Sequence, residues 1–352
     1  MSPETPSPGC FDKADVVREV GLAESRIRRY VRETWLEPSP ALGAEGGCRV
    51  ALKMENLQVT SSFKARGAFN KLLTLSDEER ARGIVTASTG NHGNATAHAL
   101  ALLGIKGEIF LPASASPAKI EGLRSRGADL RLIDDDPGRV ETVARTEAER
   151  SGRVFISPYN DPQVIGGQGT IAPELLRQVV ALEAGAQGAG AEGARADSAP
   201  LDAVFVPVGG GGLIAGIAGY LKAAAPRVRV VGCSPAASPI MAESVQAGHL
   251  VDIPWQSSLS DATVGSIEPG SITFPLCATC VDEWVSVSED EIAAALRLVI
   301  ERHLVLVEGA AALAVAGFLA TKRRWGGQTV ALVLSGARIP SATLAEVLSR
   351  PR

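Results

Sequence analysis

Short apolar segments alternate with longer segments of helical periodicity along almost the whole chain. The apolar runs 83–88, 107–113 and 202–208 are each followed by glycine or small polar residues and then by helix-like segments, at 92–104, 116–127 and 213–225. Such an alternation is typical of parallel strands that are connected by helices. The sequence therefore predicts an α/β fold with mainly parallel sheets.

The amino-acid composition limits the kinds of molecule that the protein is expected to bind. With 352 residues, 45% of them hydrophobic, the chain can bury one large core or two smaller ones. A formal net charge of −4 and an aromatic content of 4% give no indication of nucleic acid or an acidic membrane as a partner. We find no signal peptide and no apolar run of about 20 residues, the length that spans a bilayer. We therefore expect a soluble cytoplasmic protein.

The five cysteines are an odd number and are scattered along the chain, which favours reduced thiols. Cys277 and Cys280 form a CxxC pair, but a zinc site would need further ligands nearby and a redox site would need a preceding strand. We expect buried thiols instead. His98, His249 and His303 belong to no recognisable pattern, and we expect structural roles for them.

The segment TSSFKARGAFN, residues 60–70, places a lysine where an extended run turns into a helix. Apolar residues after Lys64 recur at helical spacing, so one face of this helix should be buried, with Thr60, Ser61 and Ser62 as capping residues. Lys64 could extend along apolar surface and keep its ammonium in water. Alternatively, burial and the helix N-terminus lower its pKa, and the free amine forms a Schiff base with an aldehyde.

A run of four glycines, 209–212, lies between a strand that ends at Val208 and a helix that begins near Leu213. Glycines let successive backbone N–H groups converge on one point, and the helix start adds positive potential, so the run predicts a phosphate-binding loop. It lacks the Gly-Lys-Ser/Thr of a nucleoside triphosphate loop and the acidic residue of a dinucleotide site. The alternative is a turn that is glycine-rich only for close packing.

Two further strand ends carry polar residues. The segment 88–92, STGNH, leads into a helix N-terminus and could bind a carboxylate through its N–H groups and hydroxyls, although an ordinary capped helix would look the same. Ser335 follows a strongly apolar strand, where its hydroxyl could reach a cleft or simply lie in a turn.

A Schiff-base lysine, a phosphate loop, an anion loop and a serine at a strand end together fit pyridoxal 5′-phosphate (PLP). The segments KMENLQVTSSFKARGA, ASTGNHGNA, DPQVIGGQGTIAPEL, PVGGGGLIAGIA and VLSGAR resemble the serine/threonine dehydratase and serine racemase family of fold-type-II PLP enzymes. The resemblance covers about residues 35–340. Within that family the segments 238–254 and 266–277 are similar to a branch of ectoine-utilisation and phenylserine-type dehydratases.

The resemblance implies a role for each motif. Lys64 would anchor the cofactor and act in catalysis with Ser88 and Thr89. The other residues implied to bind the cofactor are Phe63 beside the ring, Gly209, Gly210, Gly211 and Gly212 at the phosphate, Asn91 at the 3′-oxygen and Ser335 at the pyridine nitrogen. Those implied to receive the substrate carboxylate are Ser88, Thr89, Gly90, Asn91 and His92.

The implied architecture has two domains. Residues 36–80 and 160–345 would form a large PLP-binding domain, residues 81–159 a small domain with the carboxylate loop, and residues 1–35 a helical appendage. Ser234 and Ile240 occupy positions where some members carry acidic ligands to a divalent cation, so we expect no metal. Members of the family are usually homodimers or homotetramers.

The implied reaction is elimination of water from a β-hydroxy-α-amino acid, either serine- or threonine-like or bulkier, which yields a 2-oxo acid and ammonia. Racemisation is an alternative because Thr89, where many racemases have serine, keeps a hydroxyl. Replacement of the β-substituent and a non-catalytic binding protein on the same fold are further alternatives. The side chain of the substrate is not set by these motifs.

Overall fold

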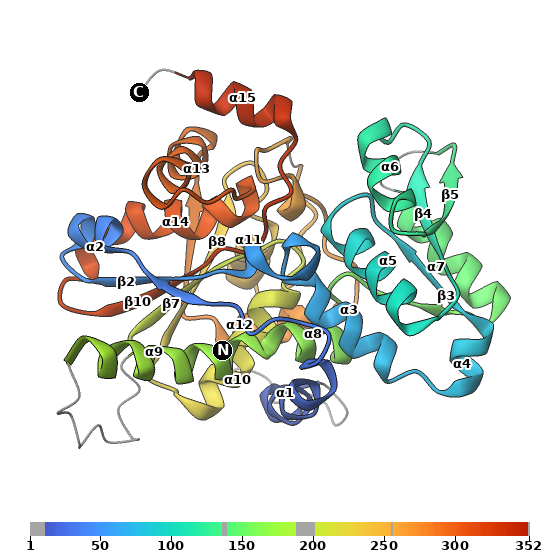
Figure 1. Cartoon of the computed structure of the whole chain (residues 1–352), viewed down its shortest axis with the longest axis horizontal. Helices are drawn as coiled ribbons and strands as arrows, with labels where there is room; N and C mark the ends of the chain where they lie inside the picture. Colours follow the sequence, from blue (N-terminus) through green and yellow to red (C-terminus); the bar gives the residue numbers. More distant parts are fainter. Residues whose placement is uncertain (1–10, 136–138, 188–200, 255, 351–352) are drawn as a thin grey trace.

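The computed structural model describes residues 11–135, 139–187, 201–254 and 256–350, and it contains two sheets (Figure 1). One sheet has six strands in the order β1-β2-β10-β7-β8-β9, and the other has four in the order β5-β4-β3-β6. Every neighbouring pair is parallel except β1 and β2. The predicted α/β fold with mainly parallel sheets is therefore confirmed.

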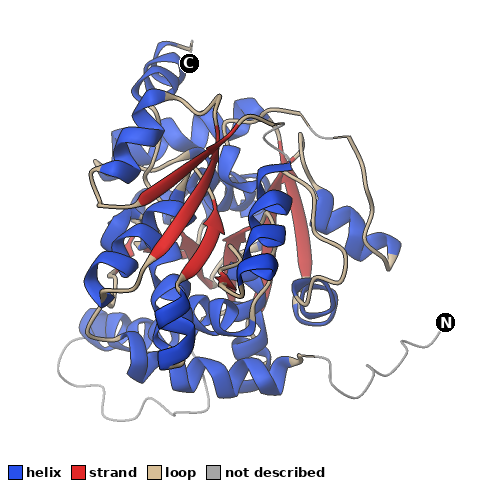
Figure 2. Ribbon diagram, turned by 90° about the vertical axis from the view of Figure 1, so that its right-hand side faces the viewer, coloured by secondary structure: helices blue, strands red, loops and turns tan. Residues whose placement is uncertain are grey.

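The six-stranded sheet is buried between two layers of helices, which Figure 1 shows above and below it, and Figure 2 shows helices on the outside of the strands. In β7, Val204 and Val206 contribute to one hydrophobic core and Ala203 and Phe205 to the other, because successive side chains of a strand point to opposite faces. Its strands are β1 (Leu36–Pro38), β2 (Arg49–Lys53), β7 (Ala203–Pro207), β8 (Arg229–Pro235), β9 (Glu283–Val287) and β10 (Thr329–Val333).

Helices of two groups cover its faces. The core on one side includes residues of α1 (Lys13–Ile27), α8 (Pro162–Gly169), α9 (Ile171–Gln187), α10 (Gly212–Ala224), α11 (Ile240–Ala247) and α12 (Thr273–Cys280). The core on the other side includes residues of α2 (Pro40–Gly46), α13 (Glu289–His303), α14 (Gly309–Thr321) and α15 (Ser341–Ser349). Short 3₁₀ turns are η1 (Glu55–Leu57), η2 (Val59–Ser61), η4 (Asp261–Thr263) and η5 (Lys322–Arg324).

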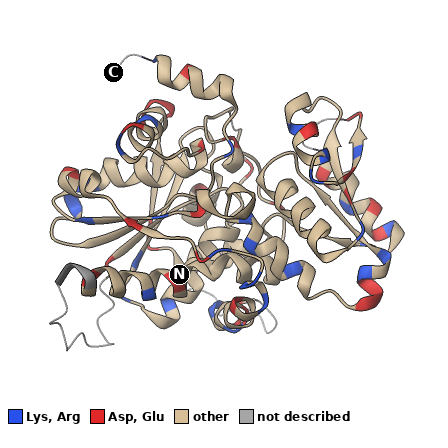
Figure 3. Cartoon of the chain, in the orientation of Figure 1, with Lys and Arg blue, Asp and Glu red and all other residues tan. Residues whose placement is uncertain are grey.

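The four-stranded sheet belongs to a smaller unit built from the middle of the first half of the chain. Its strands are β3 (Ile84–Ala87), β4 (Gly107–Pro112), β5 (Asp129–Ile133) and β6 (Val154–Phe155). Its helices are α5 (Asn91–Leu103), α6 (Pro117–Arg124) and α7 (Val140–Ser151), and it is joined to the larger unit through α3 (Lys64–Leu73) and α4 (Asp77–Arg82). Figure 3 shows Lys and Arg beside Asp and Glu on the helices of this unit.

Helix α1 lies within the segment 1–35 that the sequence suggested as an appendage. Its side chains Val16 and Val20 are fully buried in the core of the larger unit, and α1 packs against α8 and α10. The described part of this segment is thus integrated into the larger unit. The boundaries 36–80, 81–159 and 160–345 stay a prediction. The Gly/Ala-rich stretch 184–200 lies mostly outside the described residues.

A network of fully buried charges joins α3, α9 and β2. Arg66 of α3 makes two hydrogen bonds to each of two carboxylates, those of Glu55 and Glu174, at 2.7–2.8 Å. Lys53 of β2 donates to Glu174 as well, at 2.6 Å. All four side chains have no exposed surface. The network fixes the position of the helix that begins with Lys64.

The prediction that the CxxC pair consists of buried thiols is confirmed. Cys277 and Cys280 lie on α12, are buried and are free, and burial raises the pKa of both thiols. His303 is hydrogen-bonded to Ser39, and the ring of His98 packs edge-on against Phe69. Within the described ranges, no helix has the length and apolarity that a membrane span requires.

Candidate active site

Lys64 is the first residue of α3, and the residues before it are hydrogen-bonded to the end of β10. The Phe63 N–H donates to the Ser335 carbonyl at 3.1 Å, and the Ala337 N–H donates to the Ser61 carbonyl at 3.0 Å. Thr60 and Ser61 both have left-handed backbones, with φ of 62° and 63°. Such strain in non-glycine residues is typical of functional sites. The prediction that these residues cap α3 is wrong, because no side chain caps the helix. The hydroxyls of Thr60 and Ser62 are instead buried without hydrogen-bond partners in the described part of the chain.

The Lys64 amine is directed inward rather than into water. Its Nζ donates to the Pro158 carbonyl at 2.7 Å and lies 5.1 Å from the centre of the Phe63 ring. Burial lowers the pKa of Lys64 to about 8, and the attraction of Glu308 opposes this only in part. Near neutral pH a much larger fraction of this amine is therefore neutral than in an ordinary lysine, and the neutral amine is the nucleophilic form.

The glycine run 209–212 connects β7 to α10 and leaves no room for side chains. A Cβ atom at Gly210 would lie 2.6 Å from the Tyr159 ring, and one at Gly212 would lie 2.9 Å from the Tyr159 Cα. Gly211 has a φ of 87°, which other residues rarely adopt. Because Pro158 holds Lys64 and Tyr159 packs on the glycines, one short segment brings the two motifs together.

Replacement of Gly210 by alanine tests the need for this bare backbone. The new Cβ would collide with the Tyr159 ring, so the loop should shift, and we expect affinity for a phosphate-bearing ligand to fall at least about tenfold. Gly21→Ala on α1 is the matched control, because no atom lies within 4 Å of its new Cβ. Titration of both variants with PLP measures the effect. Unchanged affinity in Gly210→Ala would contradict this role of the loop.

The loop 88–92 begins at the end of β3 and runs into α5. Ser88 Oγ accepts the Gly90 N–H at 3.2 Å. The His92 imidazole faces away from this loop: its Nε2 lies 3.0 Å from Thr86 Oγ1 and 3.2 Å from the Ile156 carbonyl. Burial lowers the pKa of His92 to about 3, so the ring is neutral. His92 can therefore contribute a backbone N–H to a carboxylate, while its side chain is engaged elsewhere.

Asn91 contacts a residue that sequence reasoning missed. Its Nδ2 donates to Glu308 Oε1 at 2.8 Å and Oε2 at 3.0 Å, across the two units. Glu308 is only 3% exposed, and burial raises its pKa to about 7. The sequence does carry a signal for this residue, because Glu308 is the one charged residue in the otherwise apolar stretch 304–320. Pro158 and Tyr159 were missed too, and neither carries a local signal.

Ser335 is buried and lies two residues after the end of β10. Its hydroxyl makes no hydrogen bond within the part of the chain that the structure describes. Gly209 and Ser335 follow the carboxyl ends of β7 and β10 in the six-stranded sheet, and Ser88 follows that of β3 in the four-stranded sheet. Parallel α/β sheets bind ligands at such strand ends. The contacts above bring Lys64, Asn91, the glycine loop and Ser335 together between them.

These residues fit PLP. The glycine loop at the start of α10 has room to bind a phosphate through its backbone N–H groups. The Lys64 amine, in its neutral form, can attack an aldehyde and form a Schiff base. The chain matches the family model described as "Pyridoxal-phosphate dependent enzyme" over residues 27–336. This protein belongs to the family of pyridoxal-phosphate dependent enzymes.

Known proteins of this family agree with that assignment. An L-threonine ammonia-lyase of Thermotoga maritima is 36% identical over 334 residues, which are 95% of this chain and 78% of that protein. The solved T.th. threonine deaminase superposes with a TM-score of 0.81 at 35% identity and covers 92% of this chain and 98% of its own. Maize serine racemase gives 0.82 at 30% identity, with 94% and 98% covered.

The dehydratase and racemase family that the motifs suggested is thereby confirmed, and with it the PLP cofactor. The expected lack of a divalent cation concerns Ser234, at the end of β8, and Ile240, the first residue of α11. Among residues 11–135, 139–187, 201–254 and 256–350, no three His, Cys, Asp or Glu side chains are grouped so that they could hold a metal.

Proposed function

We propose that this enzyme eliminates water from a β-hydroxy-α-amino acid and releases a 2-oxo acid and ammonia. The observation that carries the proposal is the inward-facing, readily deprotonated amine of Lys64 beside the bare glycine loop. The named activities of the threonine ammonia-lyase and threonine deaminase relatives support the same reaction.

Lys64 would act twice. It would hold the cofactor covalently, and its amine, when free, would remove the α-proton of the substrate. Bound PLP supplies an electron sink that makes this proton acidic. Because removal of the proton needs neutral Nζ, turnover should rise with pH through the pKa of about 8.

The other polar groups position the substrate and tune the cofactor. Ser335 would offer a neutral hydroxyl to the pyridine nitrogen of bound PLP, and a serine, unlike an aspartate, would not hold a proton there. We expect this to favour prompt loss of the β-hydroxyl as water. Ser88, Thr89 and Gly90 would bind the substrate carboxylate at the start of α5, where unpaired N–H groups and positive potential coincide.

An absorbance spectrum combined with a substrate panel tests this function. The purified protein should show a band near about 410–420 nm, as expected for a PLP–lysine Schiff base. Addition of threonine, serine or bulkier β-hydroxy amino acids should then produce a 2-oxo acid with at least one of them. A band that shifts without formation of an oxo acid would contradict elimination and favour racemisation or replacement.

Racemisation is the second candidate. The Thr89 hydroxyl, on a half-buried loop, could exchange a proton on the face of the substrate opposite Lys64, and the maize serine racemase structure supports this reading. Chiral analysis of the amino acid that remains after partial turnover distinguishes the two reactions. Inverted amino acid would favour racemisation, and its absence would exclude it.

We also propose that the enzyme self-associates. Trp35, Leu304 and Leu306 are 69%, 88% and 46% exposed, which is unusual for large apolar side chains. The Met54 N–H donates to the Trp35 carbonyl and the Asn56 side-chain Nδ2 donates to the Leu306 carbonyl, so the two segments lie close together. Sedimentation or light scattering should give the mass of a dimer or tetramer, and a monomer would contradict this proposal.

A further inference from the structure

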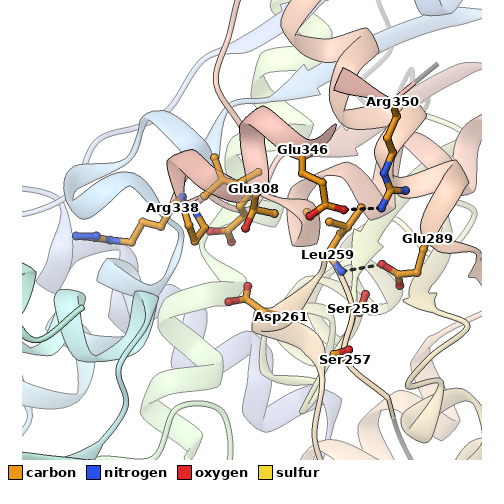
Figure 4. A pocket seen from close by; sticks show the side chains of 13 residues that line it. Ser257, Ser258, Leu259, Asp261, Glu289, Glu308, Arg338, Glu346 and Arg350 are labelled. Atoms are coloured by element: carbon orange, nitrogen blue, oxygen red, sulfur yellow. Dashed lines mark hydrogen bonds and ion pairs between the residues drawn. The ribbon is translucent and has the colours of Figure 1, made fainter. Parts of the chain in front are cut away.

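Glu308 is a buried carboxylate that lacks a cationic partner among the described residues. It directly precedes α14 and lines a cavity of about 320 Å³ that also contains Arg338 and Asp261 (Figure 4). No Lys, Arg or His nitrogen lies within ion-pair distance of it in the described ranges. Its carboxylate accepts the Arg338 backbone N–H at 3.0 Å and both contacts from Asn91.

The segment that follows β10 fixes the position of Glu308. The Glu308 N–H donates to the Gly336 carbonyl at 3.0 Å. A Cβ at Gly336 would lie 2.5 Å from Glu308 Oε1, so the glycine of the SGAR motif is needed for the carboxylate to occupy this place. The chain thus reserves a buried position for a carboxylate whose side-chain contact is Asn91.

The charge of Glu308 decides which end of the Asn91 amide faces it. An ionised carboxylate only accepts hydrogen bonds, so it requires the NH₂ end, as observed. The Asn91 Oδ1 is then left buried without a partner in the described chain, which is unfavourable. A protonated carboxyl group can donate, and would allow the amide to turn by 180° and satisfy that oxygen.

We propose that Glu308 is a positioning residue that holds the Asn91 amide with its NH₂ group available to the cofactor. This inference rests on the proposed role of Asn91 at the 3′-oxygen of PLP. That oxygen accepts hydrogen bonds, so only the NH₂ end of Asn91 can bind it, through the hydrogen that Glu308 does not use. In that orientation the Asn91 Oδ1 lacks a hydrogen-bond partner, which is energetically unfavourable.

The position is suited to switch near neutral pH. Burial raises the pKa of Glu308 to about 7, with Asp261 adding to the effect and Arg338 opposing it, and Lys64 is the other charged group in its field. Above this pH the carboxylate is ionised and holds Asn91 toward the cofactor. Below it, the carboxyl group is protonated and the amide is free to turn.

Glu308→Gln tests the inference, because glutamine keeps the shape but can stabilise the turned amide at every pH. We expect the dissociation constant of PLP to rise about tenfold at pH 8, the size of one charge-assisted hydrogen bond, and less than about twofold at pH 5.5. Glu289→Gln is the matched control, since Glu289 lines the same cavity but bonds the Leu259 N–H at 2.7 Å. It should match the wild type at both pH values.

A double-mutant cycle with Asn91→Ala tests whether Glu308 acts through Asn91. If Glu308 acts through Asn91, Glu308→Gln should change the PLP dissociation constant less than about twofold in the Asn91→Ala background. An equal loss in both backgrounds, or a loss in Glu308→Gln that is the same at pH 5.5 and 8, would overturn the inference.

Two further outcomes stay informative. Should Glu308→Gln fail to fold, Asn91→Ala alone serves, because its deficit in PLP affinity should shrink from pH 8 to pH 5.5; a constant deficit would overturn the inference. An Asn91→Ala variant with wild-type affinity would overturn the role of Asn91 and this inference with it. The proposed elimination would be left standing in either case, because it is tested by the 2-oxo acid.

Discussion

Replacement of Lys64 by alanine is expected to lower turnover by at least about 1,000-fold and to abolish the cofactor's visible band. The variant loses both the covalent attachment of PLP and the amine that removes the α-proton. The lysines nearest in the chain are engaged elsewhere: Lys53 lies in the buried charge network, and Lys71 pairs with Asp161 at 2.6 Å. Absorbance and formation of 2-oxo acid measure the two losses separately.

Lys71→Ala is the control for this prediction, because Lys71 lies on the same helix, two turns after Lys64. It should keep the band and most of the activity, with a modest loss of stability from the broken ion pair. If Lys64→Ala retained turnover with any substrate of the wild type, the assignment of Lys64 as base and anchor would be wrong.

Replacement of Arg66 by methionine is expected to lower the free energy of unfolding by about 3–5 kcal/mol. Methionine fills much of the space, but it leaves the carboxylates of Glu55 and Glu174 without the guanidinium that satisfies both. Denaturant unfolding measures the change. Arg150→Met is the control, because Arg150 is 73% exposed and its pair with Glu147 should contribute less than about 1 kcal/mol. Equal effects of the two variants would contradict the importance of the buried network.

The same network predicts how stability depends on pH. The cations Arg66 and Lys53 lower the pKa of Glu174 to about 2, against an ordinary value of 4.5. Since its folded-state pKa is depressed, Glu174 contributes its full stabilisation above about pH 4.5 and loses it as the pH falls toward 2. The Arg66→Met variant should lack much of this acid-sensitive component, which unfolding curves at several pH values can measure.

The fold was predictable because its signals are local. Parallel strands covered on both faces read as apolar runs, so β7 and β10 were visible in the sequence, as were the helices that follow the glycine and proline signals. The burial of α1 was not visible, because its apolar residues form only one stripe on a largely polar helix. Its partners, α8 and α10, are more than 130 residues away in the chain.

The site was predictable only in part. Lys64 and the glycine loop belong to motifs that are read within a few residues. Glu308 contacts Asn91 from 217 positions away, and Pro158 accepts from Lys64 over 94 positions, so these contacts depend on how the two units pack. Likewise, the orientation of His92 toward Thr86 is set by β3 and β6 and not by the loop sequence.

Borohydride reduction followed by peptide mass spectrometry tests most directly whether Lys64 carries the cofactor. Reduction fixes PLP to the lysine that holds it, and proteolysis then reveals the modified peptide. The structure predicts a single phosphopyridoxyl group on Lys64, whose amine combines the inward position with a pKa of about 8. A label on Lys71 or Lys53, or no label on a protein that retains its visible band, would contradict that assignment.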